Sequence, residues 1–323
     1  MTLRQVGTRT REAAVAAAAL MLLVAACGDG ESQDSGGGQQ NHVTVAALPL
    51  TDTAALYIAR DRGLFEKEGL EVGIRPVQQS LQALPALTKG QVDVIAGANY
   101  VTFLQAHEKG TLDVRILAEG VRTAPHMMDV LVPKDSAVKS PADLKGKTVA
   151  VNLLNNIQTL TLNAILDERG AGRPTYRQIA FPQMGPALER GQVDAVHAVE
   201  PFDSAIRSDL EARIVLDGGA SPVEALPISG YVTTARYAKK NPGTAAKFRR
   251  AIEAASKIAA RNPSAVRTEL PKYTKVTAAQ ATSLGLPAYP STADPAQFSR
   301  LVRLMRDQGL SKKAVDPSTL LVK

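Results

Sequence analysis

Pro85-Ala-Leu-Thr-Lys-Gly-Gln-Val-Asp93 and Pro186-Ala-Leu-Glu-Arg-Gly-Gln-Val-Asp194 are near copies of one stretch, identical at seven of nine positions and offset by 101 residues (186 minus 85). Each copy is typical of a helix end, with Lys89 or Arg190 in the last turn and a glycine after it as a left-handed cap. The apolar run that follows each copy predicts a buried parallel strand. A unit that occurs only twice is not a solenoid, so the repeat predicts two similar α/β lobes. A chance likeness of two helix-to-strand connections is the alternative.

The composition fits a soluble globular protein large enough for two cores. The chain has 323 residues, of which 45% are hydrophobic and 21% are charged. Trp is absent and aromatic residues make up only 4%, which argues against a carbohydrate site built on stacking platforms. The net charge is +7, but Lys and Arg are interspersed with Asp and Glu along the chain. We therefore expect no nucleic-acid partner.

The first 26 residues have the pattern of a secretory signal. Arg4, Arg9 and Arg11 precede an apolar run that is too short and too rich in alanine for a membrane span. The run ends in Leu23-Val-Ala-Ala-Cys27, which resembles a bacterial lipobox. That resemblance implies cleavage before Cys27 and its modification with lipid, palmitate included. An ordinary secreted protein with a stray cysteine is the alternative.

A polar segment rich in Gly, Ser and Gln follows the signal, and we interpret residues 27–41 as a flexible tether. Cys27 is the only cysteine of the chain, which excludes an intramolecular disulfide. The globular part is expected to begin at His42.

Strand and helix patterns alternate from there on, which predicts repeated βαβ units with parallel sheets covered by helices. The first run has expected strands at 43–48, 72–77, 92–96 and 114–118, and helices at 54–68, 81–89 and 100–109. After a strand at 129–133, the second run has strands at 148–152, 176–181, 193–199 and 213–216, and helices at 142–145, 157–169, 185–190 and 202–210. One more strand is expected at 228–234, and then a tail of helices without strands, at 242–261, 263–270, 278–284 and 295–307.

Four stretches of the sequence resemble substrate-binding proteins of ABC importers, in the branch for sulfonates, taurine, nitrate and thiamine-pyrimidine precursors. They are 48–72, Gly90-Gln-Val-Asp93, Ser140-Pro-Ala-Asp-Leu-Lys-Gly-Lys147 and Ala198-Val-Glu-Pro-Phe202. The resemblance is specific for the family and weak for the ligand.

The resemblance implies a type 2 periplasmic binding protein, which is an α/β fold of two Rossmann-like lobes joined by two crossover strands. The crossovers would be 129–133 and 228–234, so lobe 1 would comprise 42–128 and 228–323, and lobe 2 would comprise 129–227. Such a protein would be a monomer anchored by lipid on Cys27 to the outer face of the cell membrane. It would deliver a small polar organic solute, expected to be sulfonate- or taurine-like, to a separate permease and its ATPase. A binder of a thiamine-precursor pyrimidine with the same fold is the alternative.

Ligands of open α/β sheets lie at the carboxyl ends of the strands, so the strand-to-helix loops hold the candidate residues. Helix starts in these loops add unpaired N–H groups and a positive dipole end. The alternative for each candidate is a capping role alone, because caps and ligand contacts need the same side chains. We expect ligand binding by Thr51, Asp52, Thr53, Ser80, Asn99, Tyr100, Asn152, Asn155, Asn156, Gln158, Glu200, Phe202 and Ser229.

The charge of these loops bears on the ligand. They contain no Arg or Lys, so a sulfonate would be held by amides, hydroxyls and helix N-termini. By the repeat offset Glu200 corresponds to Asn99, and we expect the two residues to face each other across the cleft. Glu200 would favour a ligand that carries an amine or a ring N–H. Taurine-like and aminopyrimidine-like ligands both fit, and nitrate fits least.

The sequence contains no motif that indicates catalysis. His42, His107, His126 and His197 have no metal-ligand spacing, and no nucleophile or phosphate-binding motif is present. His197 is more typical of a core or rim histidine than of a catalytic one. We therefore expect a binding protein without metal or cofactor. An enzyme of this fold, or a solute sensor that serves a signalling kinase, is the alternative from another class.

Overall fold

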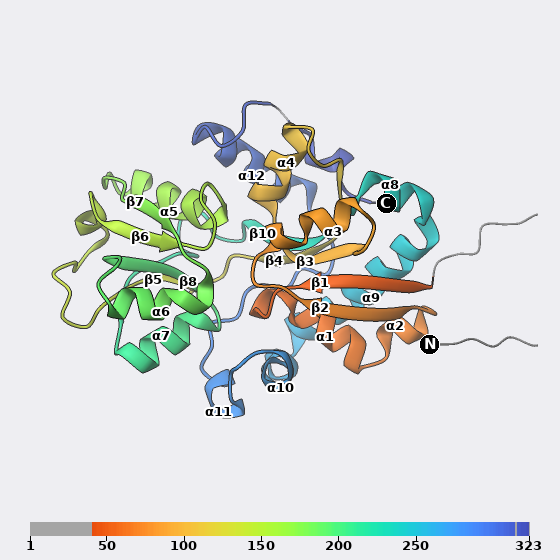
Figure 1. Ribbon diagram of the computed structural model, residues 1–323, viewed down its shortest axis with the longest axis horizontal. Helices are drawn as coiled ribbons and strands as arrows, with labels where there is room; N and C mark the ends of the chain where they lie inside the picture. Colours follow the sequence, from red (N-terminus) through yellow and green to blue (C-terminus); the bar gives the residue numbers. More distant parts are fainter. Residues whose placement is uncertain (1–40, 314, 323) are drawn as a thin grey trace, which may run out of the picture. The chain divides into compact units, whose positions relative to one another are not determined.

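The computed structural model describes residues 41–313 and 315–322, which belong to one compact unit, Gln39–Lys323. The predicted signal, Cys27 and nearly all of the predicted tether lie outside the described residues. Two five-stranded sheets organise the unit (Figure 1). No helix within the described ranges is long and apolar enough to span a membrane.

The first sheet has the order β2-β1-β3-β10-β4. Its strands are β1 (His42–Ala47), β2 (Glu71–Pro76), β3 (Val94–Asn99), β4 (Val114–Arg122) and β10 (Pro227–Thr234). β1 is parallel to β2 and β3, whereas β10 is antiparallel to both β3 and β4. β4 is thus parallel to β1, β2 and β3, as the run of βαβ units predicted. In this sheet β10, the strand expected as a crossover, runs the opposite way, because it comes from the far end of the chain and inserts between β3 and β4.

The second sheet repeats this arrangement with the order β7-β6-β8-β5-β9. Its strands are β5 (Met128–Val132), β6 (Thr148–Val151), β7 (Thr175–Gln178), β8 (Ala195–Val199) and β9 (Arg213–Asp217). β5 is antiparallel to β8 and β9. β3 and β8, the strands after the two copies of the repeated stretch, both hold the third place in their sheets. The two-fold α/β architecture predicted from the repeat is therefore confirmed.

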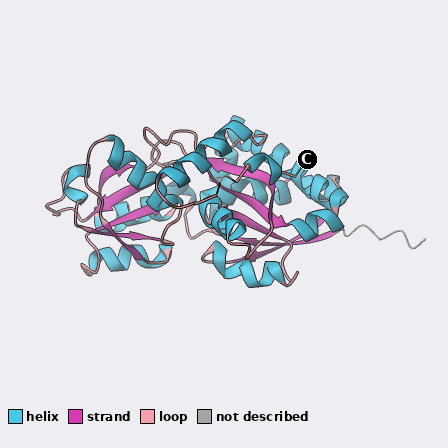
Figure 2. Cartoon of the chain, turned by 90° about the horizontal axis from the view of Figure 1, so that it is seen from above, coloured by secondary structure: helices cyan, strands magenta, loops and turns pink. Residues whose placement is uncertain are grey.

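Helices cover the sheets, and Figure 2 shows the strands lying among them. The α-helices are α1 (Ala54–Asp61), α2 (Leu64–Lys67), α3 (Leu84–Thr88), α4 (Tyr100–Glu108), α5 (Ile157–Glu168), α6 (Phe181–Glu189), α7 (Phe202–Leu210), α8 (Ala235–Lys240), α9 (Pro242–Arg261), α10 (Pro263–Tyr273), α11 (Ala278–Ala281) and α12 (Pro295–Asp307). Short 3₁₀ turns are η1 (Thr51–Thr53), η2 (Ser80–Ala83), η3 (Pro141–Leu144) and η4 (Pro317–Thr319).

Local backbone geometry explains where the predicted element bounds fail. The helix expected at 54–68 is two helices, because Gly63 takes a left-handed φ of 64° between them. The strand expected at 176–181 ends at Gln178, and Phe181 already begins α6. The glycine caps of the repeated stretch are confirmed, with φ of 72° at Gly90 and 63° at Gly191.

The C-terminal segment returns to the first sheet. α9 packs on α1, and residues of the tail pair with β4 through the bridges Ile116–Leu321 and Arg122–Ala288. Apart from these isolated bridges, the described part of the tail has helices and no β-strand, as the sequence pattern predicted, although the pattern missed α8. The aromatic ring of Phe298 on α12 lies in the core, edge-on to Tyr100 with centroids 4.9 Å apart.

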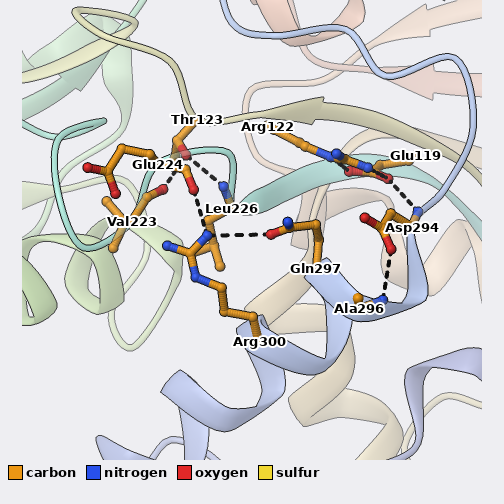
Figure 3. A network of polar contacts seen from close by, with 10 residues as sticks. All are labelled: Glu119, Arg122, Thr123, Val223, Glu224, Leu226, Asp294, Ala296, Gln297 and Arg300. Carbon is orange, nitrogen blue, oxygen red and sulfur yellow. Dashed lines mark hydrogen bonds and ion pairs between the residues drawn. The ribbon is translucent and has the colours of Figure 1, made fainter.

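The chain passes between the sheets twice, at residues 123–127 and 218–226, just before the two segments predicted as crossovers. The two links are bonded to each other. Thr123 donates its N–H to the Leu226 carbonyl at 2.9 Å and accepts the Leu226 N–H at its hydroxyl at 2.9 Å. Arg300 of α12 donates to the Glu224 carbonyl at 2.6 Å, which ties the second link to the helical tail (Figure 3).

Candidate functional site

A cavity of about 40 Å³ lies at the carboxyl ends of strands from both sheets, and we call it the inner cavity. The first sheet and its loops contribute Leu48, Leu50, Asp52, Ser80, Gly97, Asn99, Ile228 and Ser229. The second sheet and its loops contribute Met128, Asn152, Leu153, Asn156, Ile157, Gln158, Phe181 and Val199. The structure thus brings together these predicted ligand-binding residues: Asp52, Ser80, Asn99, Asn152, Asn156, Gln158 and Ser229.

Asp52 is the acidic residue of the inner cavity. It lies in the middle of η1, directly after the loop that leaves β1, and only 8% of the residue is exposed. Its Oδ2 accepts the Ser229 hydroxyl at 2.6 Å, while its Oδ1 has no hydrogen-bond partner among the described residues. Burial raises the pKa of the Asp52 carboxyl. The lining residues named above include no Lys, Arg or His, so this carboxyl has no basic side chain beside it in the lining.

The amides after β6 hold their own loop together. Asn156 caps α5, because its Oδ1 accepts the N–H groups of Gln158 at 3.0 Å and Thr159 at 3.3 Å. Gln158 accepts from the Asn152 N–H at 2.8 Å and from the Asn156 amide at 3.2 Å, and it donates to the His197 carbonyl. The cluster therefore serves as structure as well as lining.

The capping interactions also decide what the helix starts can offer to a ligand. At the start of α4, Asn99 accepts the Thr102 N–H at 3.3 Å. At the start of α5, Asn156 accepts the N–H groups of Gln158 and Thr159 in the same way. Because capping side chains already use these N–H groups, they are not available to an oxyanion in this arrangement. The sulfonate contact expected at helix N-termini loses three N–H donors, those of Thr102, Gln158 and Thr159.

Loops of the two sheets touch on either side of the inner cavity. The Gln79 amide donates to Asn152 twice, at 3.0 Å to the backbone carbonyl and at 3.1 Å to Oδ1. Thr51 donates its N–H and its hydroxyl to the Glu200 carbonyl, both at 3.4 Å. Because these hydrogen bonds join loops of the two sheets, they have to break for a solute to enter between the loops.

Glu200 lies outside the inner cavity lining, although its neighbour Val199 belongs to that lining. Its carboxylate is fully buried and accepts the Ser204 hydroxyl at 2.7 Å and the Gly285 N–H at 3.0 Å. Asn99 lines the cavity, so the side chains of the two residues do not face each other there. The physical reason is that a donor from the distant C-terminal segment satisfies Glu200 in the protein interior.

The other predicted residues outside the inner cavity have structural roles in this arrangement. The Thr53 hydroxyl donates to the Leu48 carbonyl at 2.8 Å and to that of Leu50 at 3.1 Å. Tyr100 lies in the core, and Asn155 is exposed with a left-handed φ of 54°.

Phe202 lines a second, larger hollow of about 1,140 Å³, which we call the outer groove. Helices α6 and α7 form one part of it, and residues 273–284 of the tail form another. The Phe202 ring stacks on Phe181 with centroids 5.6 Å apart, and Phe181 lines both the groove and the inner cavity. Phe181 therefore offers an aromatic ring to the inner cavity.

Sequence reasoning missed Met128 and Ile228 in the apolar part of the lining, and it interpreted His197 correctly. Met128 and Ile228 line the cavity from strand ends, where nothing in the local pattern separates them from core residues. His197 on β8 is fully buried, and burial lowers its pKa to about 4, so it is neutral at physiological pH. It is a core histidine, as its strand context favoured.

Comparisons with known proteins place the chain. The model of a family described as NMT1/THI5 like matches residues 50–266, more than half of the chain. A protein of Haemophilus influenzae named for thiamine biosynthesis is 30% identical over 146 residues, which span 45% of each chain, so the match covers less than half of that relative.

Solved structures confirm the type 2 periplasmic binding protein fold. The alkanesulfonate-binding protein SsuA of Xanthomonas axonopodis pv. citri superposes with a TM-score of 0.72 at 21% identity, covering 88% of this chain and 98% of that one. The periplasmic nitrate-binding protein NrtA of Synechocystis PCC 6803 has a TM-score of 0.71 at 14% identity, with coverage of 86% and 84%.

Proposed function

Because the chain belongs to the NMT1/THI5-like family, we propose that it is an extracytoplasmic solute-binding lipoprotein of an ABC importer. The observation that carries the proposal is the inner cavity, which loops of both sheets line with carboxyl, hydroxyl and amide groups. A small polar solute would be enclosed there when the two halves close, with 42–128 and 228–323 as lobe 1 and 129–227 as lobe 2.

The charge of the cavity favours a cargo that carries an amino group or a ring N–H. Asp52 is the acidic residue of the lining, and one of its oxygens has no protein donor among the described residues. A charge-assisted hydrogen bond from a ligand N–H would satisfy that oxygen. A simple alkanesulfonate or nitrate would instead bring a second negative charge beside Asp52.

Of the cargo classes that the sequence leaves open, an aminopyrimidine fits best. Its amino group and ring nitrogens match a carboxylate, hydroxyls and amides, and a flat ring can stack on Phe181. A taurine-like zwitterion fits less well, because Asn99 and Asn156 already occupy helix-start N–H groups that its sulfonate would need.

Delivery and anchoring complete the proposal. The closed form would be presented to a separate permease and its ATPase, and lipid on Cys27 would hold the protein at the outer face of the cell membrane. Substituting Cys27→Ala should move the protein from the membrane fraction to the soluble extracytoplasmic fraction. Unchanged membrane association of this variant would contradict the anchor.

Thermal unfolding of the purified protein against a ligand panel tests solute binding. The panel is a 4-aminopyrimidine, taurine, an alkanesulfonate and nitrate. A ligand that binds only the folded state adds RT ln(1 + [L]/Kd), about 4 kcal/mol at a thousandfold excess over Kd. We expect the aminopyrimidine to raise the melting temperature most. A protein that binds none of these compounds but chemically converts one of them would contradict the proposal.

A further inference from the structure

A histidine and two aspartates meet beside the two links between the sheets, away from the inner cavity lining. His126 lies in the first link, Asp129 lies in β5, and Asp217 ends β9 just before the second link. Asp129 and Asp217 are directly paired across the two strands. One ligand atom of each of the three side chains lies within 4.8 Å of those of the other two.

The buried carboxylates of this region have fewer donors than they need. Asp129 is fully buried, and its Oδ1 has no hydrogen-bond partner among the described residues. Asp203 of α7 is also fully buried, and neither of its oxygens has such a partner. A buried carboxylate without donors or a cation costs several kcal/mol. Burial, followed by the nearby charge of Asp129, raises the pKa of Asp203 to about 8.

The basic side chains that face these acids are few. Arg207 lies 3.6 Å from Asp203 Oδ1 and is partly exposed, and His126 lies 3.1 Å from Asp129 Oδ2. The acidic side chains are Asp129, Asp203 and Asp217, with Glu200 close enough to raise the pKa of Asp203. Acidic side chains therefore outnumber basic ones around Asp129.

We propose that His126, Asp129 and Asp217 bind a divalent transition-metal ion such as Zn²⁺. Imidazole and carboxylate together are ligands that Zn²⁺ prefers, with metal–ligand bonds of about 2.0–2.2 Å. Two ligand atoms on a tetrahedral ion are then roughly 3.3 Å apart. His126 Nδ1 and Asp129 Oδ2, which share a hydrogen bond of 3.1 Å in this structure, are already close to this spacing.

Hydrogen bonds around the three side chains orient them as metal ligands, and the cluster is open to solvent. Asp217 Oδ1 accepts the N–H groups of His126 at 3.1 Å and Gly219 at 2.8 Å, which fixes its carboxylate as outer hydrogen bonds do around metal ligands. The His126 side chain is 56% exposed, so an ion can reach the cluster from solvent. Three protein ligands leave room for a solvent ligand.

The position of the site gives the ion a mechanical role. His126 belongs to the first link between the sheets, and Asp217 adjoins the second. A bound ion would therefore hold together the two links that join the proposed lobes. The hydrogen bonds between Thr123 and Leu226 already join the same two links. This role does not depend on which solute the inner cavity binds.

The test measures metal binding by the chelator-treated, purified protein with ZnCl₂ and CoCl₂ as probes. We expect one equivalent of Zn²⁺ by equilibrium dialysis and the visible absorption of low-symmetry Co²⁺. His126→Ala changes an exposed side chain, so it should fold, and it should weaken Zn²⁺ binding at least about tenfold. Asp217→Asn should weaken it as well.

His42→Ala is the matched control, because His42 is also exposed and lies 3.7 Å from a carboxylate, that of Glu71. This variant should bind Zn²⁺ like the unchanged protein. Equal loss in His42→Ala and His126→Ala would mean adventitious surface binding and would overturn the proposal. So would absence of stoichiometric binding, or binding by His126→Ala as tight as that of the unchanged protein.

Discussion

Replacing Asp52 with asparagine is the most informative change in the inner cavity. Asn has the same shape and can still accept the Ser229 hydroxyl, which Asp52 accepts at 2.6 Å, so the fold should be retained. What is lost is the negative charge of a lining residue whose Oδ1 has no protein partner. The variant therefore isolates the contribution of charge to ligand binding.

The magnitude follows from the hydrogen bond that Asp52 would make with a ligand N–H. A bond to a charged group contributes about 1.5–3 kcal/mol and a neutral one about 0.5–1.5 kcal/mol. Asp52→Asn should thus cost about 1–2 kcal/mol of binding free energy, or about 5- to 30-fold in Kd. Isothermal titration of both proteins with a 4-aminopyrimidine measures it. Equal Kd values would refute the assignment of Asp52 as the residue that accepts a hydrogen bond from the amino group of the ligand.

The same variant should be more stable at neutral pH without ligand. Burial raises the pKa of Asp52, so the folded state holds this proton more tightly than the unfolded chain does. The free energy of unfolding therefore falls as the pH rises above the ordinary Asp value and through the raised one. Asp52→Asn should remove this part of the pH dependence. Urea unfolding of both proteins at pH 5 and pH 8 shows it, and a larger stability loss at pH 8 in the variant than in the unchanged protein would contradict the sign.

Three further changes test separate parts of the account. Glu200→Gln should leave the Kd for an aminopyrimidine within about threefold, because the carboxylate is bonded to Ser204 and Gly285 and does not line the inner cavity; a loss as large as that of Asp52→Asn in the same titration would contradict this placement. Gln79→Ala removes the two hydrogen bonds to Asn152 and should speed ligand dissociation at least about fivefold in stopped-flow measurements; an unchanged rate would mean that these bonds do not hold the closed form. Phe298→Ala should cost about 3–5 kcal/mol of unfolding free energy in urea, because the ring is fully buried against Tyr100; a cost below 1 kcal/mol would contradict its core role.

Much of the fold could be predicted from the sequence because the decisive signals are local. The glycines that end the repeated stretch adopt left-handed conformations at Gly90 and Gly191, and a buried strand follows each of them. The insertion of β10 between β3 and β4 could not be predicted in this way. Strand order depends on pairing between residues more than 100 positions apart, such as Tyr231 with Ala118, which no local period reports.

The candidate site shows the same limit. The loop positions of Asp52, Asn152 and Gln158 could be predicted, because strand ends and capping patterns locate such loops. The sequence did not allow us to predict which acidic side chain lines the inner cavity. The direction of Glu200 is set by the N–H of Gly285, 85 residues further along the chain, so its neighbours in sequence do not contain the information.

The central claim is that the inner cavity binds a small solute through an amino group. The most direct measurement is isothermal titration of the purified protein with a 4-aminopyrimidine and with the same ring lacking the amino group. We expect one-to-one binding of the amino compound, about tenfold or more tighter than the compound without it, since a charge-assisted bond of about 1.5–3 kcal/mol is lost. Equal affinity for the two rings, or tighter binding of an alkanesulfonate than of either, would contradict the claim.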